Sequence, residues 1–361
     1  MSVVYKKLED VCEILDSRRV PITAKDRKAG AYPYYGANGL QDYVADYIFD
    51  DELVLLAEDG GNFGSKERPI AYRVSGKCWV NNHAHVLKAK PNMHVDYLCY
   101  ALMFYDTEGL VNGATRQKLT QAAMRQMVIP YRDMTEQLQI IEKISQIVRS
   151  IEKRKEELQL LDQLVKSRFI ELFGDSEFNT MQWPTEKLSE LCVVSSSKRI
   201  YQNEQSTEGV PFLRISDLNE RIDNVKNAPE LFIPINKYNE LKENGLVPTE
   251  GDILVTSRGT LGRCYIVRPE DEFYFQDGMI SWLSDLSHQI TSLYLSQLFA
   301  MSGIQKQIAS LQAGSTVAYL SISMLKKLDI MLPPLNLQNQ FAVFVEQTDK
   351  SKLCGKMEVA A

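Results

Sequence analysis

The 361-residue chain has few of the features that mark secreted, membrane or metal-binding proteins. Its six cysteines are spread out, and no two have the spacing of a zinc finger, so reduced thiols are expected. No run of about 18 apolar residues is present, which argues against a membrane-spanning helix and a membrane partner. The first residues lack the apolar core of a signal peptide. These absences together predict a cytoplasmic protein.

The chain also lacks an excess of positive charge. It has 41 Lys and Arg against 47 Asp and Glu, for a net charge of −6. This excludes a uniformly basic protein that coats nucleic acid, but it allows a basic surface on an acidic body. With 44% hydrophobic and 24% charged residues, the composition is typical of globular proteins, and the length is enough for two or three domains.

Catalytic motifs are missing as well. The segment nearest to the Asp/Asn-Pro-Pro-aromatic loop of adenine methyltransferases is Leu332–Leu335, which has no polar group to grip a base and is better interpreted as a helix start. Gly61–Lys66 has the residues of a phosphate-binding loop in the wrong order. Glu270–Glu272 lacks the lysine of a nuclease centre, and no Ser-His-Asp pattern is found. The sequence predicts a chain that performs no reaction alone.

One alternative remains open at this stage. His83 and His85 are two residues apart, with Cys78 nearby, and on a strand they would share one face. They could then hold a metal with nearby carboxylates, and the chain would be a metal-assisted nuclease. No third ligand stands at short spacing, so ordinary loop histidines are the favoured interpretation.

What the chain does contain is an internal repeat. Short segments of the first half return in the same order in the second half, at an offset that drifts from about 180 to about 203 residues. The matching segments are 7–12 and 187–192, 32–35 and 210–213, 52–56 and 252–256, 60–64 and 259–262, 113–115 and 314–316, 128–130 and 331–333, and Gln137 and Gln338. Their common order indicates a duplicated domain followed by a helix, with insertions in surface loops.

Each half is followed by a predicted helix. Residues 135–173 contain no Gly or Pro, and a heptad-like apolar pattern with charged residues outside predicts a coiled-coil helix of about 58 Å. The pattern, with one phase slip, comprises Ile141, Ile144, Val148, Ile151, Leu158, Leu161, Val165, Arg168 and Leu172. Such a helix needs a partner, and residues 337–353 supply one that ends near Cys354–Lys356. The order of the segments makes the pair antiparallel.

The predicted fold class is mixed α/β (α+β): two duplicated target-recognition domains joined by long antiparallel coiled-coil helices. The expected divisions are 1–134 for the first domain, 135–173 for the central helix, 174–334 for the second domain and 335–361 for the short terminal helix. Strands are expected at 53–57, 70–74, 86–89 and 253–256, and short helices at 95–105 and 290–301.

Basic, amide and hydroxyl residues gather in the predicted loops, interleaved with aromatic residues. Arginine and lysine bind phosphates and guanine edges, and amides bind adenine edges, so this composition suits DNA. The candidates are Arg18, Arg19, Lys28, Tyr35, Asn38, Asn62, Gly64, Lys66, Asn81, Asn82 and Arg116 in the first half, and Lys198, Arg199, Arg214, Ser257, Arg258, Gly259, Arg263, Gln276, Thr316 and Tyr319 in the second. Solvated loops are the alternative for any single one of them.

Taken together, these segments resemble the DNA specificity subunits of Type I restriction–modification systems. The resemblance covers nearly the whole chain. It lies in the domain starts 7–12 and 187–192, in Tyr32–Gly39, Ser257–Gly262, Gly113–Arg116 and Gly314–Thr316, in the prolines before the helices, and in Lys166–Gly174, which looks like the end of that family's central helix.

The resemblance implies a function. Each target-recognition domain would read one half of a split double-stranded DNA site, with Asn62 and Gly64 in the first domain and Ser257, Arg258 and Gly259 in the second lying at DNA. The helices would space the half-sites by about 17 base pairs and dock two modification subunits. Restriction subunits would join them, and S-adenosylmethionine, ATP and Mg²⁺ would belong to partner subunits, with no cofactor bound by this chain.

Two points stay open. The terminal helix looks about half as long as the central one, so either a partner protein covers the remainder of the central helix or the C-terminus is truncated. A duplicated scaffold that binds protein instead of DNA is a further alternative, and it predicts no salt-dependent DNA affinity.

Overall fold

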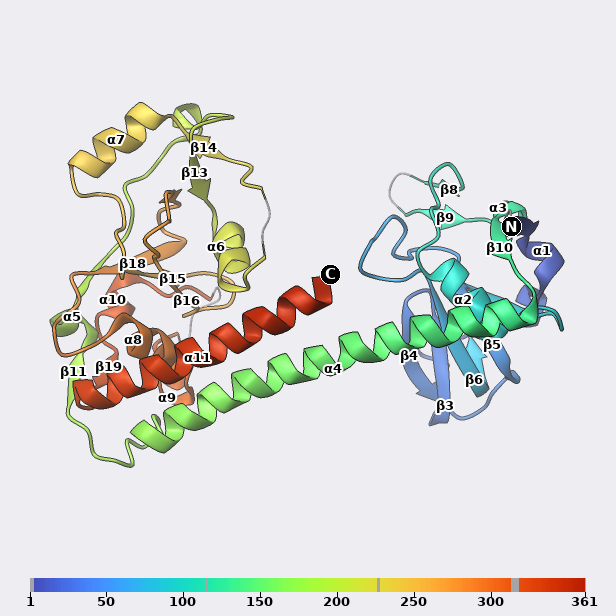
Figure 1. Cartoon of the computed structure of the whole chain (residues 1–361), viewed down its shortest axis with the longest axis horizontal. Coiled ribbons are helices and arrows are strands. Elements are labelled where there is room, and N and C mark those ends of the chain that lie inside the picture. The colour runs from blue at the N-terminus through green and yellow to red at the C-terminus, as the bar shows by residue number, and fades with distance from the viewer. Residues whose placement is uncertain (1–2, 114–115, 226–227, 313–317, 361) are drawn as a thin grey trace. The chain divides into compact units, whose positions relative to one another are not determined.

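A computed structural model describes residues 3–113, 116–225, 228–312 and 318–360. The chain divides into two compact units, Met1–Glu152 (unit 1) and Lys153–Ala361 (unit 2), and the division falls within helix α4 (Met134–Phe173). Each unit contains strands and short helices (Figure 1). No helix among the described residues is long and apolar enough to cross a membrane.

Unit 1 is built around a six-stranded sheet of order β2-β7-β5-β6-β3-β4, antiparallel except where β3 lies parallel to β6. Its elements are β1 (Val4–Lys7), α1 (Leu8–Val11), β2 (Cys12–Ile14), η1 (Asp16–Arg18), β3 (Ala29–Gly36), β4 (Gly39–Val44), β5 (Phe49–Ala57), β6 (Ala71–Val80), β7 (Ala84–Ala89), α2 (Val95–Met103), β8 (Val111–Asn112), β9 (Lys118–Leu119), α3 (Gln121–Gln126) and β10 (Val128–Tyr131). Helix α2 packs on β5 and β6. Strands β1 and β10 pair at the start of α4.

Unit 2 contains a four-stranded sheet of order β12-β18-β15-β16 and a three-stranded sheet of order β14-β13-β17. Its elements are β11 (Thr185–Lys187), α5 (Leu188–Leu191), β12 (Val193–Ser195), η2 (Gln202–Glu204), β13 (Val210–Leu213), α6 (Ile215–Ile222), β14 (Phe232–Ile233), α7 (Ile235–Glu243), β15 (Ile253–Thr256), β16 (Cys264–Ile266), β17 (Tyr274–Phe275), β18 (Ile280–Ser284), α8 (Ser292–Phe299), α9 (Ser302–Leu311), α10 (Ile322–Leu325), β19 (Asp329–Met331) and α11 (Leu335–Ala360).

The predicted duplication is confirmed by the sheet topology. The order β2-β7-β5-β6 of unit 1 has the same connectivity as β12-β18-β15-β16 of unit 2, and all these neighbours are antiparallel. The β1–β10 ribbon corresponds to the β11–β19 ribbon, and β13 lies parallel to β17 as β3 does to β6. Unit 2 differs in having α6 and α7 after β13, where unit 1 has only β4.

A buried glutamine repeats in atomic detail. The Gln137 side chain accepts from the His94 backbone N–H and donates to the carbonyls of Asn92 and Arg132. Gln338 does the same in unit 2, accepting from the Thr291 N–H and donating to the carbonyls of Gln289 and Pro333. Both side chains are fully buried. Because a buried amide without partners is costly, each glutamine ties the start of a long helix to the globular part of its unit.

Two details of the repeat alignment are wrong. Strand pairing makes Val54 the counterpart of Ile253, whereas the sequence match placed Leu53 there. Ribbon pairing makes Pro130 the counterpart of Met331, so the two closing prolines are not equivalent. Side chains alternate between the faces of a strand, and a shift of one residue exchanges core for solvent, so packing and not letter similarity sets the register.

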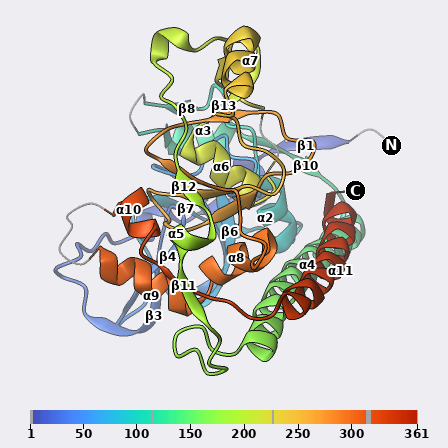
Figure 2. The same cartoon turned by 90° about the vertical axis from the view of Figure 1, so that its left-hand side faces the viewer.

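The predicted helix pair is present. Within unit 2, α4 and α11 lie side by side and antiparallel (Figures 1 and 2): Phe169 and Phe173 contact Phe341, while the Lys352 ammonium lies 2.8 Å from the Asp162 carboxylate. The predicted end of the second helix near Cys354–Lys356 is wrong, because α11 continues to Ala360. A glycine inside a helix costs about 1 kcal/mol and does not by itself end it.

The buried side of α4 differs in part from the predicted stripe. Val165, Phe169 and Phe173 are buried, whereas Leu161 and Leu172 are only half-buried. The guanidinium of Arg168 lies over the Phe344 ring. A strict heptad omitted Phe169 and Phe173, because this segment packs on α8 as well as on α11 and needs a wider apolar face.

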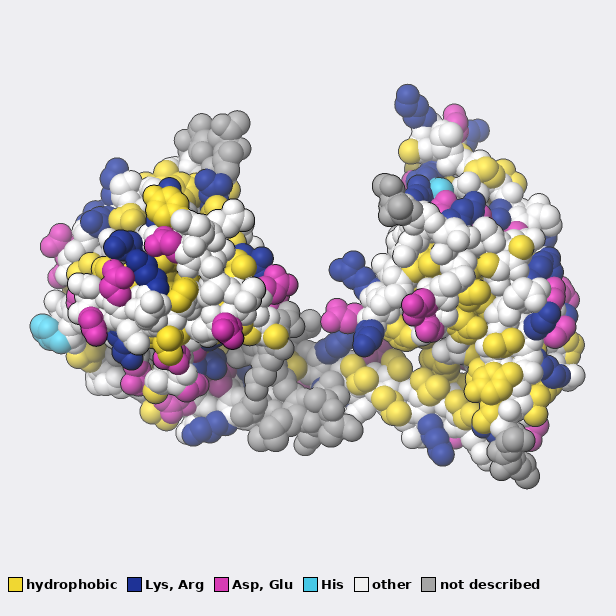
Figure 3. All heavy atoms as spheres, turned by 90° about the horizontal axis from the view of Figure 1, so that it is seen from above, with side chains coloured by type: hydrophobic (Ala, Val, Ile, Leu, Met, Phe, Trp, Pro, Cys, Tyr) yellow, Lys and Arg dark blue, Asp and Glu magenta, His cyan; other side chains and the backbone are white. Residues whose placement is uncertain are grey.

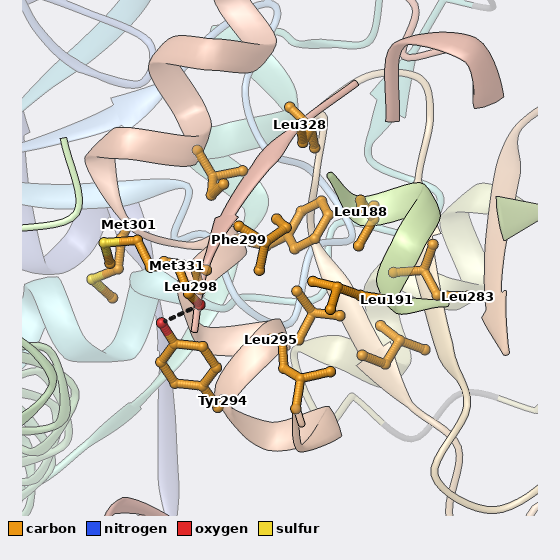
Figure 4. Close-up of a cluster of buried hydrophobic side chains, with 14 of the residues drawn as sticks. Leu188, Leu191, Leu283, Tyr294, Leu295, Leu298, Phe299, Met301, Leu328 and Met331 are labelled. Atoms are coloured by element: carbon orange, nitrogen blue, oxygen red, sulfur yellow. Dashed lines mark hydrogen bonds between the residues drawn. The ribbon is translucent and has the colours of Figure 1, made fainter. Parts of the chain in front are cut away.

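One apolar core of unit 2 lies where α8 meets α5, β18 and β19. Figure 4 shows Leu295, Leu298 and Phe299 of α8 directed toward other buried apolar side chains. The Tyr294 hydroxyl donates to the Met331 carbonyl, as Tyr97 donates to Pro130 in unit 1. The strands and short helices expected from the sequence are all present, with β5 and β6 longer than predicted and α8 shorter.

Candidate nucleic-acid interface

In unit 1 the loop that follows β5 gathers three other segments. The Glu58 N–H donates to the His83 carbonyl, which ties the loop to the turn before β7. The Gly60 N–H donates to the Gln117 carbonyl, and the Asn38 side chain donates to the Gly60 carbonyl. Residues from the β3–β4 turn, the β5 loop, the β7 turn and the approach to β9 therefore form one surface, called the first loop cluster below.

The second loop cluster occupies the corresponding place in unit 2. The Ser257 N–H donates to the Met279 carbonyl and the Leu320 N–H donates to the Ser257 carbonyl, as Leu119 donates to Glu58 in unit 1. The cluster consists of residues 257–262, the turn 276–279 and residues 318–320.

Equivalent glycines begin both loops in the left-handed region. Gly60 has φ +61° and Gly259 has φ +71°, a conformation that other residues adopt only at a cost. A side chain at Gly259 would meet no atom within 4 Å, so the glycine is required by the backbone and not by crowding. The backbone of each loop is thereby left open at the surface.

Each loop cluster presents one exposed guanidinium. Arg116 lies across Gly60 and donates to the Asp59 carboxylate at 2.9 Å, and the His83 Nδ1 is 2.6 Å from the same oxygen. Arg258 lies over the Tyr319 ring at 5.3 Å, and no carboxylate within 4 Å of it is found among the described residues. Arg258 stands at the position that Asp59 occupies in unit 1. The guanidinium therefore comes from the loop after β15 in unit 2 but from the segment before β9 in unit 1.

The other arginines of the predicted set in unit 2 are held by carboxylates. Arg199 pairs with Asp277 at 2.9 Å, and Arg214 pairs with Glu230 at 2.7 Å and also with Asp217. Arg263 binds Asp223 and Asn219 of α6. Such pairs neutralise the cation locally and leave less charge for phosphates.

Several predicted residues lie behind the surface. The polar side chains of Asn81 and Ser257 are buried and bonded inside their units, to Gln41 and Ser281 respectively. Arg19 is bonded to Glu58 and to the Ala84 carbonyl. A side chain committed to buried partners can shape the surface but is not free to contact DNA.

The remaining predicted residues are distributed as follows. Those exposed are Arg18, Lys28, Asn38, Gly64, Lys66, Asn82, Lys198, Arg199 and Gly259. Those half-buried are Tyr35, whose ring lies against that of Tyr72, Asn62 bonded to the Pro69 carbonyl, Gln276, and Tyr319. Arg18 is tied to β5 through the Ile48 carbonyl and the Phe49 ring. Thr316 lies outside the described residues.

On the faces seen in Figure 3, basic side chains are scattered among acidic ones in both units and do not merge into one basic area.

The positions of His83 and His85 do not support a metal site. His83 and His85 do not converge, since His83 faces Asp59 while His85 is buried against Asp16. Among the described residues, Asp16, Glu58 and His85 have potential ligand atoms within 4.8 Å of one another. These atoms already contact proton donors, because Arg19 and Lys118 bind Glu58 and Gln121 binds Asp16. The cationic groups of Arg19 and Lys118 therefore stand where a metal ion would have to bind, and this set of ligand atoms does not fit a metal ion.

Sequence reasoning missed Asp59 as a member of the first loop cluster, and it assigned His83 to a different role. Asp59 forms a β-bridge with Lys118, and Gln41 bonds to Asn81. The available signal was the repeat itself: Asp59 directly precedes the first glycine loop, as Arg258 directly precedes the second.

The chain matches the model of one known protein family over most of its length. A family model described as "Type I restriction modification DNA specificity domain" matches residues 2–161 and again residues 181–354. The chain belongs to this family. The double match agrees with the duplicated strand order of the two units.

Known relatives of this specificity family span nearly the whole chain. A Haemophilus influenzae protein named as a type I restriction enzyme specificity subunit is 29% identical over 352 residues, covering 96% of this chain and 87% of that protein. A Methanocaldococcus jannaschii type I restriction enzyme specificity subunit is 22% identical, covering 95% and 85%. The crystal structure of the S subunit from M. genitalium has a similar fold, with a TM-score of 0.55 at 15% identity over 100% of this chain and 92% of that one.

Proposed function

We propose that this chain is the DNA-reading subunit of a Type I restriction–modification complex, in which each unit reads one half of a split double-stranded site. The observation that supports this most directly is the repeated loop cluster. Two sheets of the same topology each end in a loop with a left-handed glycine and one exposed guanidinium, Arg116 or Arg258. Guanidinium groups read guanine edges and bind phosphates, and an open glycine backbone allows close approach of a DNA strand.

The two loop clusters are expected to recognise different DNA sequences. In unit 1 the guanidinium of Arg116 is accompanied by Asp59, His83 and Asn38, whereas in unit 2 Arg258 is accompanied by Tyr319 and Gln276. Different donors and acceptors at equivalent places select different base edges. The split site should therefore be asymmetric.

The helices α4 and α11 are proposed as the spacer and as the docking surface for two modification subunits. Leu160 and Leu164 of α4 and Val343 of α11 are about half exposed, although their helices pair along another face. Apolar side chains left exposed beside a packed helix pair fit a partner protein. Restriction subunits would join this assembly, and S-adenosylmethionine, ATP and Mg²⁺ would be bound by the partner subunits.

Sequencing of genomic adenine methylation tests the proposal in cells that express this chain with its modification subunits. The expected result is a two-part asymmetric motif with a fixed gap of unread base pairs. A contiguous motif from an active complex would reject it. In the purified complex, DNA affinity should fall steeply as salt rises, whereas a scaffold that binds only protein would show no such dependence.

A further inference from the structure

A buried charged cluster lies beneath the first loop cluster. His85 of β7 is fully buried, with Nδ1 2.6 Å from the Asp16 carboxylate and Nε2 2.9 Å from the Leu119 carbonyl. Asp16 also accepts from the Val86 N–H and from the Gln121 side chain. The neighbouring Glu58 binds Arg19 at 2.7 Å and Lys118 at 3.0 Å, and lies 3.7 Å from the His85 ring. We call Asp16, Arg19, Glu58, His85 and Lys118 the charge cluster.

Two hydrogen bonds fix the orientation of the His85 ring. The Leu119 carbonyl can only accept, so the Nε2 of His85 bears a proton. Nδ1 faces the Asp16 carboxylate. Burial disfavours ionisation of Asp16, but the hydrogen bond and charge of His85, the Val86 N–H and Arg19 outweigh it and hold the pKa of Asp16 below its usual value. Both ring nitrogens of His85 therefore face hydrogen-bond acceptors, the Asp16 carboxylate and the Leu119 carbonyl.

The charge cluster links segments that form the first loop cluster. Glu58 is the residue before Asp59 and Gly60, and Lys118 and Leu119 form β9, which begins two residues after Arg116. His85 connects both to η1 through Asp16. Loss of the His85 ring would remove one hydrogen bond from the buried Asp16 carboxylate and one from the Leu119 carbonyl, and so weaken the link between these segments.

Unit 2 has no such charge at the equivalent place. Strand pairing makes Ser281 the counterpart of His85, Ser257 the counterpart of Glu58, and Ser196 the counterpart of Asp16. Ser257 and Ser281 are buried and joined by one hydroxyl–hydroxyl hydrogen bond of 2.8 Å. The two units therefore support the same loop in different ways, one with ion pairs and the other with neutral hydroxyls.

The geometry points to His85 as a positioning residue for recognition of the first half-site: its ring, bonded to Asp16 and to the Leu119 carbonyl, holds the Asp59–Gly60 loop and the Arg116 segment in the orientation that meets DNA. This inference rests on the proposed function, since it concerns the same loop. Its distinctive consequence is selectivity, because a change at His85 should affect one half-site and spare the other.

The test uses the full chain in its complex with the modification subunits. Protection of each half-site is measured separately on one DNA duplex for the wild type, His85→Gln, Asp16→Asn and Ser281→Ala. Glutamine cannot supply two donors in the geometry of the ring, and asparagine keeps the shape of Asp16 but removes its charge. Ser281→Ala is the matched control, since it changes the equivalent place in unit 2.

Both unit 1 variants are expected to weaken protection of the first half-site about tenfold and to leave the second unchanged, because a buried charged hydrogen bond is lost. Ser281→Ala should leave the first half-site unchanged. With selective ¹⁵N-histidine labelling, the His85 signals should show both nitrogens protonated in the wild type and a neutral ring in Asp16→Asn, a signature that a purely structural role would not require.

The outcomes separate this inference from the proposed function. Equal weakening of both half-sites, or wild-type protection of the first half-site by a folded Asp16→Asn variant whose ring is neutral, overturns the inference while the proposed function stands. Should His85→Gln fail to fold, Asp16→Asn alone decides between these results. A wild-type complex that protects no half-site overturns the proposed function, and the inference with it.

Discussion

At the scale of single residues, the partners of each arginine decide what it can do. Arg258 has an aromatic ring beside it, whereas Arg263 is bound to the Asp223 carboxylate and to Asn219. Arg258 can therefore bind DNA without first giving up an ion pair, whereas Arg116 would have to share or release the Asp59 carboxylate. The structure therefore separates residues that the sequence listed together.

Replacing Arg258 should test this distinction. Arg258→Ala is expected to weaken binding at the second half-site by about 1–3 kcal/mol and to leave the thermal midpoint nearly unchanged. Arg263→Ala is the comparison variant, and it should lower stability by up to about 1 kcal/mol because a partly exposed ion pair is lost. Binding titrations and thermal unfolding of both variants check this. A large loss of stability in Arg258→Ala with intact DNA binding would contradict it.

The charge cluster should also make unit 1 sensitive to acid. Burial raises the pKa of Glu58, but Arg19, Lys118 and His85 outweigh this and hold it below the usual value, as happens for Asp16. A carboxyl with a lowered pKa in the folded state stabilises the protein above its unfolded pKa, near 4, and the contribution is lost as pH falls through the folded value.

Urea unfolding between about pH 7 and pH 3 measures this effect. The wild type should lose stability as pH falls below about 4, and Asp16→Asn should start lower at neutral pH and fall less steeply. Glu67 is an exposed carboxylate of the same unit, and it forms no ion pair with any described residue. It provides the control variant Glu67→Gln, which should follow the wild-type curve. Parallel curves for Asp16→Asn and the wild type would show that this carboxylate adds no acid dependence.

At the scale of elements, the two buried glutamines anchor the long helices to their units. Each bonds to the residue that caps a short helix, α2 or α8, and to two carbonyls. The same three hydrogen bonds in both halves explain why the glutamine recurs in the sequence while most of its neighbours have changed.

Removal of either glutamine should therefore cost a similar amount. Gln137→Ala or Gln338→Ala leaves a buried backbone N–H without an acceptor, and each should lower the free energy of unfolding by about 1–3 kcal/mol. Gln139→Ala, on the exposed side of α4, should change it by less than about 0.5 kcal/mol. Denaturant unfolding of the three variants decides the matter, and a neutral Gln137→Ala would contradict the anchoring role.

At the scale of the whole molecule, the duplication makes each unit replaceable. Unit 1 has its own sheet and its own apolar core, as does unit 2. If each reads one half-site, replacing residues 1–134 with the equivalent part of another family member should change one half of the methylated motif and leave the other half and the gap unchanged. Methylome sequencing gives the answer directly, and a change in both halves would contradict independent reading.

Much of the fold could be predicted from the sequence. The repeat, the long helix, its antiparallel partner and the strand segments follow from periodicity and from the order of motifs, which are local properties of the chain. Details that depend on packing could not be predicted. The register of Val54 was wrong by one residue, and Phe169 and Phe173 were missed because α4 packs on two neighbours at once.

The candidate site was predictable only as a set of loops. Asn38 and Arg116 were singled out by residue type, and Gly60 only as part of a repeated glycine loop. Their proximity depends on hydrogen bonds between segments 22 and 57 residues apart. The charge cluster depends on still more distant pairs, such as Gln121 with Asp16 across 105 residues. No local pattern reports a partner at that distance.

The sequence by itself determined the family, the duplication and the kinds of elements, since these depend on the order and spacing of residues along the chain. Only the tertiary structure decided which cations are paired with carboxylates, which polar groups are buried, and that one loop rests on charge and the other on hydroxyls. The physical reason is that burial and ion pairing are properties of residues brought together by folding. An arginine without a neighbouring carboxylate can bind a ligand, whereas one beside a carboxylate forms an ion pair inside its unit.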